Sequence, residues 1–76
     1  MSKQEQLIEY TIQDIVQFIV EDRKIDFDQA MHMFYDSHTF DKLQDLTTGL
    51  YTESPAYVYG IFQDEQNFGR LIQAEI

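Results

Sequence analysis

The sequence predicts an all-α fold: one small domain, residues 1–76, of about four helices in the order long, short, short, long. Apolar residues recur at helical spacing in four segments. The chain has only one proline and three glycines, too few for a loop-rich or many-stranded β fold. Six Phe and five Tyr supply the bulk for one compact core, and a chain of 76 residues holds at most one domain.

The first helix is predicted over residues 3–24. Its apolar stripe falls at i, i+4, i+7 and i+11 and consists of Ile8, Ile12, Ile15 and Ile19. Ser2 and Glu5 have the spacing of a capping box, in which each side chain satisfies a free amide of the other residue. At ~1.5 Å per residue, such a helix is about 33 Å long.

The apolar arc of this helix is wide, because Leu7, Val16 and Phe18 extend it beyond the isoleucine stripe. A helix that is apolar over more than half of its circumference has to bury both sides. The three other helices offer limited cover, so we expect a homodimer through the first helix, most simply with two-fold symmetry.

Two short helices are predicted next. Asp26 is the expected cap of the second helix, whose buried stripe is Phe27, Ala30, Met31 and Phe34. Thr39 is the expected cap of the third helix, from Phe40 to Leu46, and Gly49 is expected to end it in the left-handed conformation. Residues 47–52 could instead be extended, although a lone strand has no partner in the chain.

The last helix is predicted to begin at Ser54 and Pro55, with serine as cap and proline in the first turn. One face carries Val58, Ile61, Phe62 and Glu65. Gly60 weakens a helix interior by about 1 kcal/mol relative to alanine, which predicts another element packed closely against it. Whether residues 66–76, with Leu71 and Ile72, continue the helix is left open.

The formal charge of −9 comes from 14 acidic against five basic residues. Nucleic acids and anionic membranes are bound mainly through Lys and Arg, so we expect neither as a partner. There is no cysteine for disulfides, thiolate metal sites or thiol catalysis. The N-terminal segment has no apolar core of a signal peptide, and no apolar run is long enough to cross a membrane. We therefore expect a cytoplasmic protein.

One polar ridge carries side chains of the types that bind metal ions. Asp28, His32 and Asp36 follow one another at i, i+4 and i+8 on the second helix. Such spacing can supply two or three ligands, but a competent site usually needs another from a second element. A solvated helix face is the favoured interpretation. No phosphate loop, nucleophile elbow or zinc-hydrolase motif is present, so we expect no cofactor and no enzymatic activity.

The candidate contact site is a cluster of tyrosines near the Gly49 turn: Tyr51, Tyr57 and Tyr59. Aromatic side chains with a polar end are enriched at interfaces, although roofing the core is an equally good interpretation of the cluster. The acidic residues expected to join it are Asp41, Asp45, Glu53 and Asp64. Together they predict a module that binds and masks a protein partner, which the charge suggests is basic.

The alternative function is a small DNA-binding regulator, because consecutive helices can imitate a helix-turn-helix. Its recognition helix would be Phe40 to Leu46, which carries Asp41 and Asp45 against Lys42 alone. That charge is poor for a major groove.

Residues 15–65 also resemble a group of small, functionally uncharacterised bacterial helical domains. The resemblance rests on Ser37-His38-Thr39-Phe40-Asp41-Lys42-Leu43, Asp45, Thr48-Gly49-Leu50-Tyr51, Glu53-Ser54-Pro55 and Tyr57-Val58-Tyr59. Members of this group are often encoded beside other short proteins, in operons suggestive of toxin–antitoxin pairs. The resemblance supports the helical fold and implies a partner-binding, antitoxin-like role with no catalytic residues to carry across.

Overall fold

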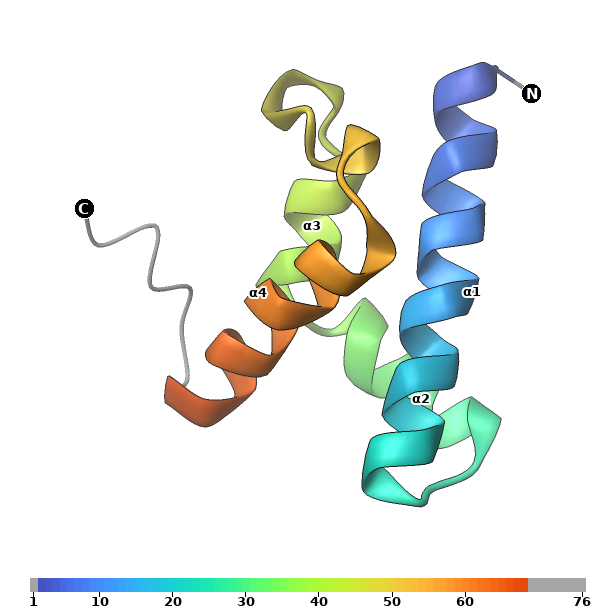
Figure 1. The fold of residues 1–76 in the computed structure, drawn as a ribbon, viewed down its shortest axis with the longest axis vertical. Coiled ribbons are helices and arrows are strands. Elements are labelled where there is room, and N and C mark those ends of the chain that lie inside the picture. The colour runs from blue at the N-terminus through green and yellow to red at the C-terminus, as the bar shows by residue number, and fades with distance from the viewer. Residues whose placement is uncertain (1, 69–76) are drawn as a thin grey trace.

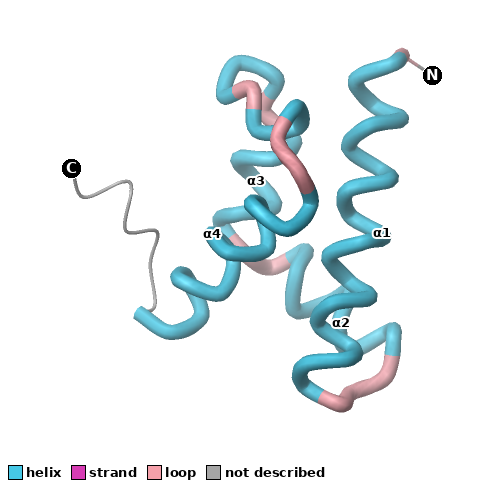
Figure 2. The backbone as a smooth tube through the Cα atoms, in the orientation of Figure 1, coloured by secondary structure: helices cyan, strands magenta, loops and turns pink. Residues whose placement is uncertain are grey.

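A computed structural model describes residues 2–68 of the chain (Figures 1 and 2). The elements in chain order are α1 (Lys3–Arg23), α2 (Phe27–Tyr35), α3 (His38–Gln44), the 3₁₀ turns η1 (Leu46–Thr48) and η2 (Leu50–Thr52), and α4 (Pro55–Phe68). The predicted all-α fold with a long, short, short, long order is confirmed. Residues 47–52 form 3₁₀ turns, so the extended alternative for this segment is wrong.

The capping box predicts the start of α1 correctly. The Glu5 amide donates to Ser2 Oγ at 3.1 Å, and the Ser2 amide donates to Glu5 Oε1 at 3.0 Å. The pKa of the Glu5 carboxyl is lowered, mainly by the hydrogen bond from the Ser2 amide and secondly by the interaction with the Ser2 side chain. The helix ends at Arg23, and Lys24 caps it in a left-handed conformation with φ 56°, its amide donating to the Val20 carbonyl.

Asp26 caps α2 as predicted, since its Oδ1 accepts from the Gln29 amide at 2.8 Å. The predicted cap of α3 is wrong. Ser37 is the cap, with its Oγ accepting from the Phe40 amide at 3.1 Å, and the helix begins at His38. Thr39 instead lies inside the first turn and is completely buried.

The connection between α3 and α4 is built from two successive 3₁₀ turns. Gly49 has the predicted left-handed conformation, with φ 67°, and its amide donates to the Leu46 carbonyl. It ends η1 and not α3, which already ends at Gln44, so the predicted helix end is corrected. Leu50 then turns inward and is 9% exposed, which fixes the connection to the core.

Ser54 and Pro55 start α4 as predicted, with the Tyr57 amide donating to Ser54 Oγ at 3.2 Å. The expectation of close packing at Gly60 is wrong, because a Cβ built there lies within 4 Å of no neighbouring element among residues 2–68. The helix continues without a break to Phe68. Leu71 and Ile72 lie outside the described residues.

The helices enclose one core. α1 packs against both α2 and α4, and α3 packs against α4 and η2. In Figure 1, α1 stands along one side of the molecule and α4 crosses in front of α3. Phe34 lies at the centre, with the rings of Phe40 and Phe62 edge-on to it at 5.6 and 5.5 Å. The largest fully buried side chains are Phe34, Phe62, Ile15, Ile19, Leu43, Val16, Val58 and Thr39.

The molecule is thin, with extents of 32 × 32 × 18 Å, about two helix diameters in the short direction. Several apolar side chains therefore remain in contact with solvent. Phe27, which the sequence places in the core, is 47% exposed, and Leu46 is 50% exposed. α1 buries Ile8, Ile15 and Ile19 while leaving Leu7 46% exposed.

Candidate functional site

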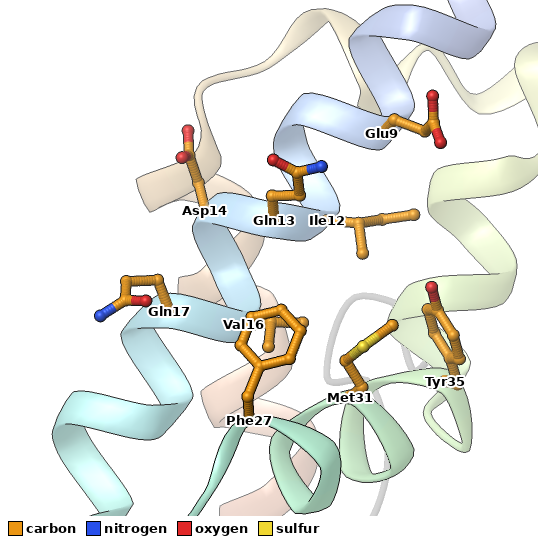
Figure 3. A pocket seen from close by; sticks show the side chains of 9 residues that line it. All are labelled: Glu9, Ile12, Gln13, Asp14, Val16, Gln17, Phe27, Met31 and Tyr35. Atoms are coloured by element: carbon orange, nitrogen blue, oxygen red, sulfur yellow. The ribbon is translucent and has the colours of Figure 1, made fainter.

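A groove of about 490 Å³ runs between α1 and α2 (Figure 3). Its floor is apolar: Phe27, Met31 and Tyr35 come from α2, and Ile12 and Val16 come from α1. In Figure 3, Phe27 lies over Val16, and Met31 and Tyr35 follow it along α2. The floor thus presents two aromatic rings and a thioether, side chains typical of protein-binding surfaces.

The spacing of α2 explains this floor. Phe27, Met31 and Tyr35 lie at i, i+4 and i+8, so their side chains form one line beside the buried residues Ala30 and Phe34. Phe27 is 47% and Tyr35 is 42% exposed. α2 is therefore apolar on a wider arc than the core covers, and the excess faces solvent.

The ring of Tyr35 is held in place by a ring of α3. Its ring centroid lies 4.7 Å from that of Phe40 of α3. A ring fixed by packing loses little further freedom when a partner covers it, which reduces the entropic cost of binding. The end of the groove is in this sense preorganised.

The rim of the groove is polar and lies on α1. It consists of Glu9, Gln13, Asp14 and Gln17. All four side chains are exposed. Among the described residues, the lining contains two carboxylates and no Lys or Arg, which makes the electrostatic potential in the groove negative.

A second hollow, of about 580 Å³, continues along α1 towards its N-terminus. It shares Glu9 and Ile12 with the first groove. Its other lining residues are Ser2, Glu5, Ile8, Gln44 and Leu46. The two hollows therefore form one track beside α1, and in the part of the chain that the structure describes its charged lining residues are all acidic.

The predicted tyrosine cluster is divided by the structure. Tyr57 and Tyr59 are two residues apart on α4 and so lie on nearly opposite sides of it. Tyr57 is 53% exposed and borders a small hollow of about 170 Å³ with Lys42, Thr48 and Leu50.

Tyr59 instead joins α4 to α1. Its ring lies 5.2 Å from that of Phe18, and its hydroxyl donates to Asp22 Oδ2 at 2.6 Å. Burial, followed by the bond to Asp22 and its negative charge, raises the pKa of Tyr59 to about 12. Tyr51 is half-buried against the core. Only Tyr57 of the three thus projects strongly into solvent.

The predicted acidic residues differ in exposure and in bonding. Asp41 and Glu53 are exposed, and Asp64 is half-buried on α4. Asp45 has a structural task, because its Oδ1 accepts from the Thr47 hydroxyl at 2.7 Å and from the Thr47 amide at 3.0 Å. These two hydrogen bonds lower the pKa of the Asp45 carboxyl, and the bond from the Thr47 hydroxyl has the larger effect.

The polar ridge of α2 is exposed at Asp28, His32 and Asp36. Within residues 2–68, no three His, Asp or Glu side chains are gathered closely enough to hold a metal ion. Nor is any helix of this part of the chain long and apolar enough to cross a membrane.

A buried carboxylate was missed by the sequence analysis. Glu65 of α4 is 7% exposed and reaches the start of α3. Its Oε2 accepts from the His38 amide at 2.8 Å, and its Oε1 accepts from the Thr39 amide and hydroxyl at 2.9 and 2.7 Å. A carboxylate is stabilised by the free amides and the dipole at a helix N-terminus. The position of Glu65 on the apolar face of α4 was the available signal.

The groove was missed as well, since Phe27 and Met31 were assigned to the core and Tyr35 to no stripe. The i, i+4, i+8 line of large apolar side chains was the signal in the sequence.

Comparison of the chain with protein-family models, with curated proteins and with solved structures finds no match.

Proposed function

We propose that this chain is an acidic protein-interaction module that acts by binding and masking a partner protein, without catalysis. The observation that carries the proposal is the groove between α1 and α2, which combines an exposed apolar floor with an acidic rim. Large apolar side chains gathered in a concave, water-exposed surface commonly mark protein-binding sites. The negative rim favours a basic partner and accelerates its association.

The DNA-binding alternative is weakened by the start of α3. A recognition helix contacts DNA through the residues at its N-terminus. Here the His38 and Thr39 amides are already bonded to the Glu65 carboxylate, which adds a negative charge where DNA would approach. Asp41 is exposed on the same helix, whereas Lys42 is half-buried.

The resemblance to small bacterial domains encoded beside short proteins is compatible with masking. An antitoxin-like protein has to cover a functional surface of its partner, which an apolar groove with a charged rim can do. Gene order offers a first check: a neighbouring reading frame for a small basic protein would support this role.

The direct test is affinity capture of the full chain from the organism that encodes it, followed by identification of bound proteins and light scattering of the complex. We expect a partner in stoichiometric amount. A monomer that recovers no stoichiometric partner would contradict the proposal. A salt-dependent mobility shift of duplex DNA by the purified chain would favour the DNA-binding alternative instead.

A further inference from the structure

We infer that the α1–α2 groove receives an amphipathic helix of the partner, with basic residues on either side of its apolar face. This inference rests on the proposed function and names the binding surface and the chemistry of the occupant. It also moves the contact away from the tyrosines near Gly49, because the continuous apolar floor lies on α2 and not on α4.

The dimensions of the track fit a helix. Phe27, Met31 and Tyr35 span about 12 Å along α2 at ~1.5 Å per residue. The joined hollows run beside α1 from Ser2 to Gln17, about 22 Å by the same rise. A ligand helix of roughly 15 residues, or four turns, covers that length.

The walls also favour a helix over a strand. A strand adds to a sheet edge through unpaired amides and carbonyls. The walls of the α1–α2 groove are two helices whose interior amides and carbonyls bond within the helix, and the second hollow lies between α1 and the segment of Gln44 and Leu46. Recognition therefore has to come from side chains, and apolar residues at i, i+3, i+4 and i+7 of a ligand helix suit a groove of this kind.

The charge of the groove lining determines which residues should flank the apolar face of the ligand helix. Within residues 2–68, the charged side chains that line the two hollows are Glu5, Glu9 and Asp14, with no Lys or Arg. Lysines or arginines on both sides of the ligand's apolar stripe would lie opposite this rim. A second copy of this chain is a poor occupant, since a chain of net charge −9 would place more acids against the rim.

The test uses a synthetic probe and the full chain. The probe is a 16-residue peptide with leucines at i, i+3, i+4, i+7 and i+11 and lysines on both flanks. Two matched peptides replace the lysines with glutamates or scramble the leucine spacing. Binding is measured by titration calorimetry and mapped by amide shifts in ¹⁵N NMR spectra. We expect the lysine peptide alone to bind, with the largest shifts at Ile12, Gln13, Met31 and Tyr35.

Paired variants of equal charge separate the groove from the overall negative field. Glu9→Lys with Asp14→Lys should weaken the lysine peptide roughly five- to tenfold and admit the glutamate peptide. Asp41→Lys with Glu53→Lys changes the net charge equally on other exposed positions and should change affinity less than twofold. Circular dichroism verifies that both variants remain folded.

The apolar floor has its own matched pair. Phe27→Ala removes a 47% exposed ring from the groove and should weaken the lysine peptide roughly tenfold. Tyr57→Ala removes a 53% exposed ring from α4 and should leave the affinity unchanged. Equal effects of the two variants, or amide shifts centred on Tyr57, would overturn the inference.

Further results of these experiments would refute either the groove inference or the proposed function. Binding of the glutamate or scrambled peptide as tightly as the lysine peptide would refute a basic amphipathic ligand, and a dimer whose interface covers Met31 would refute a partner helix. If affinity capture recovers a partner equally well with the Glu9→Lys/Asp14→Lys and Phe27→Ala variants, the groove inference fails while the proposed function stands. If no partner is recovered at all, the proposed function itself fails.

Discussion

Replacing Gly49 and replacing Gly60 by alanine should change stability in opposite directions. Gly49 has φ 67°, which an L-residue adopts only at a cost, so Gly49→Ala should destabilise the fold by about 1 kcal/mol. Gly60 lies in a helix with open space at its Cβ position, so Gly60→Ala should stabilise it by about 0.5–1 kcal/mol. Urea unfolding of both variants measures the signs, and a destabilising Gly60→Ala would indicate close packing after all.

Ionisation of the Tyr59 hydroxyl should lower the stability of the fold at high pH. Its pKa is raised from 10.0 to about 12 in the folded chain, so the folded state holds the proton more tightly than the unfolded state. The stabilisation is complete below pH 10.0 and disappears as the pH rises to about 12. At pH 8, Tyr59→Phe should cost up to about 1 kcal/mol of unfolding free energy, for one exposed hydrogen bond.

The comparison of the wild type with Tyr59→Phe by urea unfolding, repeated from pH 8 to pH 11, isolates this group from the other tyrosines and the lysines. We expect the difference between the two proteins to narrow as the pH rises above 10.0. A constant difference would mean that the Asp22 bond does not follow the ionisation of Tyr59. Tyr57→Phe, at an exposed ring on the other side of α4, is the control.

The start of α3 depends on α4 through Glu65. Glu65→Ala leaves two amides and the buried Thr39 hydroxyl without their acceptor and should cost about 2–4 kcal/mol. Thr39→Val keeps the volume and removes one hydrogen bond, at a cost of about 1 kcal/mol. Gln66→Ala, at the exposed neighbour, should change stability by less than about 0.5 kcal/mol.

Chemical denaturation supplies these values, and the double variant Glu65→Ala/Thr39→Val tests the link between the two helices. Because the two residues share a hydrogen bond, the double variant should cost less than the sum of the single variants. Additive costs would show that Glu65 acts independently of Thr39.

Helices with local signals were predictable from the sequence. The capping box of Ser2 and Glu5, the Asp26 cap and the Ser54-Pro55 start all act within a few residues, so the sequence locates α1, α2 and α4 well. The start of α3 was missed by two residues. Ser37 and Thr39 are both good caps, and Thr39 is drawn into the helix by bonds to Glu65, 26 positions away.

The sequence shows the line of Phe27, Met31 and Tyr35 but not that this line is exposed, because exposure depends on which side of α2 the other helices leave uncovered. Periodicity puts Phe27 and Met31 close to Phe34 on the helix surface, so all three look like core residues. Packing buries Phe34 completely and leaves Phe27 47% exposed. The tyrosine hypothesis depended on closeness in sequence, and α4 turns Tyr57 and Tyr59 to different sides.

Taken together, the charges of the chain predict that folding and binding respond to salt in opposite ways. A net charge of −9 repels itself in the compact state, and added salt screens this repulsion. Raising NaCl from 20 to 200 mM should therefore increase the melting temperature while weakening binding of the lysine peptide. A scanning calorimeter and a titration calorimeter measure the two trends, and trends of the same sign would contradict the electrostatic account.

The bonds from Glu65 to α3 also have a consequence for the order in which the chain opens. α3 has seven residues, too few to be stable alone, and its start is satisfied by a side chain of α4. When α4 detaches, α3 loses its acceptor and should unfold with it, whereas α1 and α2 are joined by their own local contacts. In native-state hydrogen exchange, α3 and α4 should therefore behave as one cooperative unit, and the His38 and Thr39 amides should exchange together with those of α4.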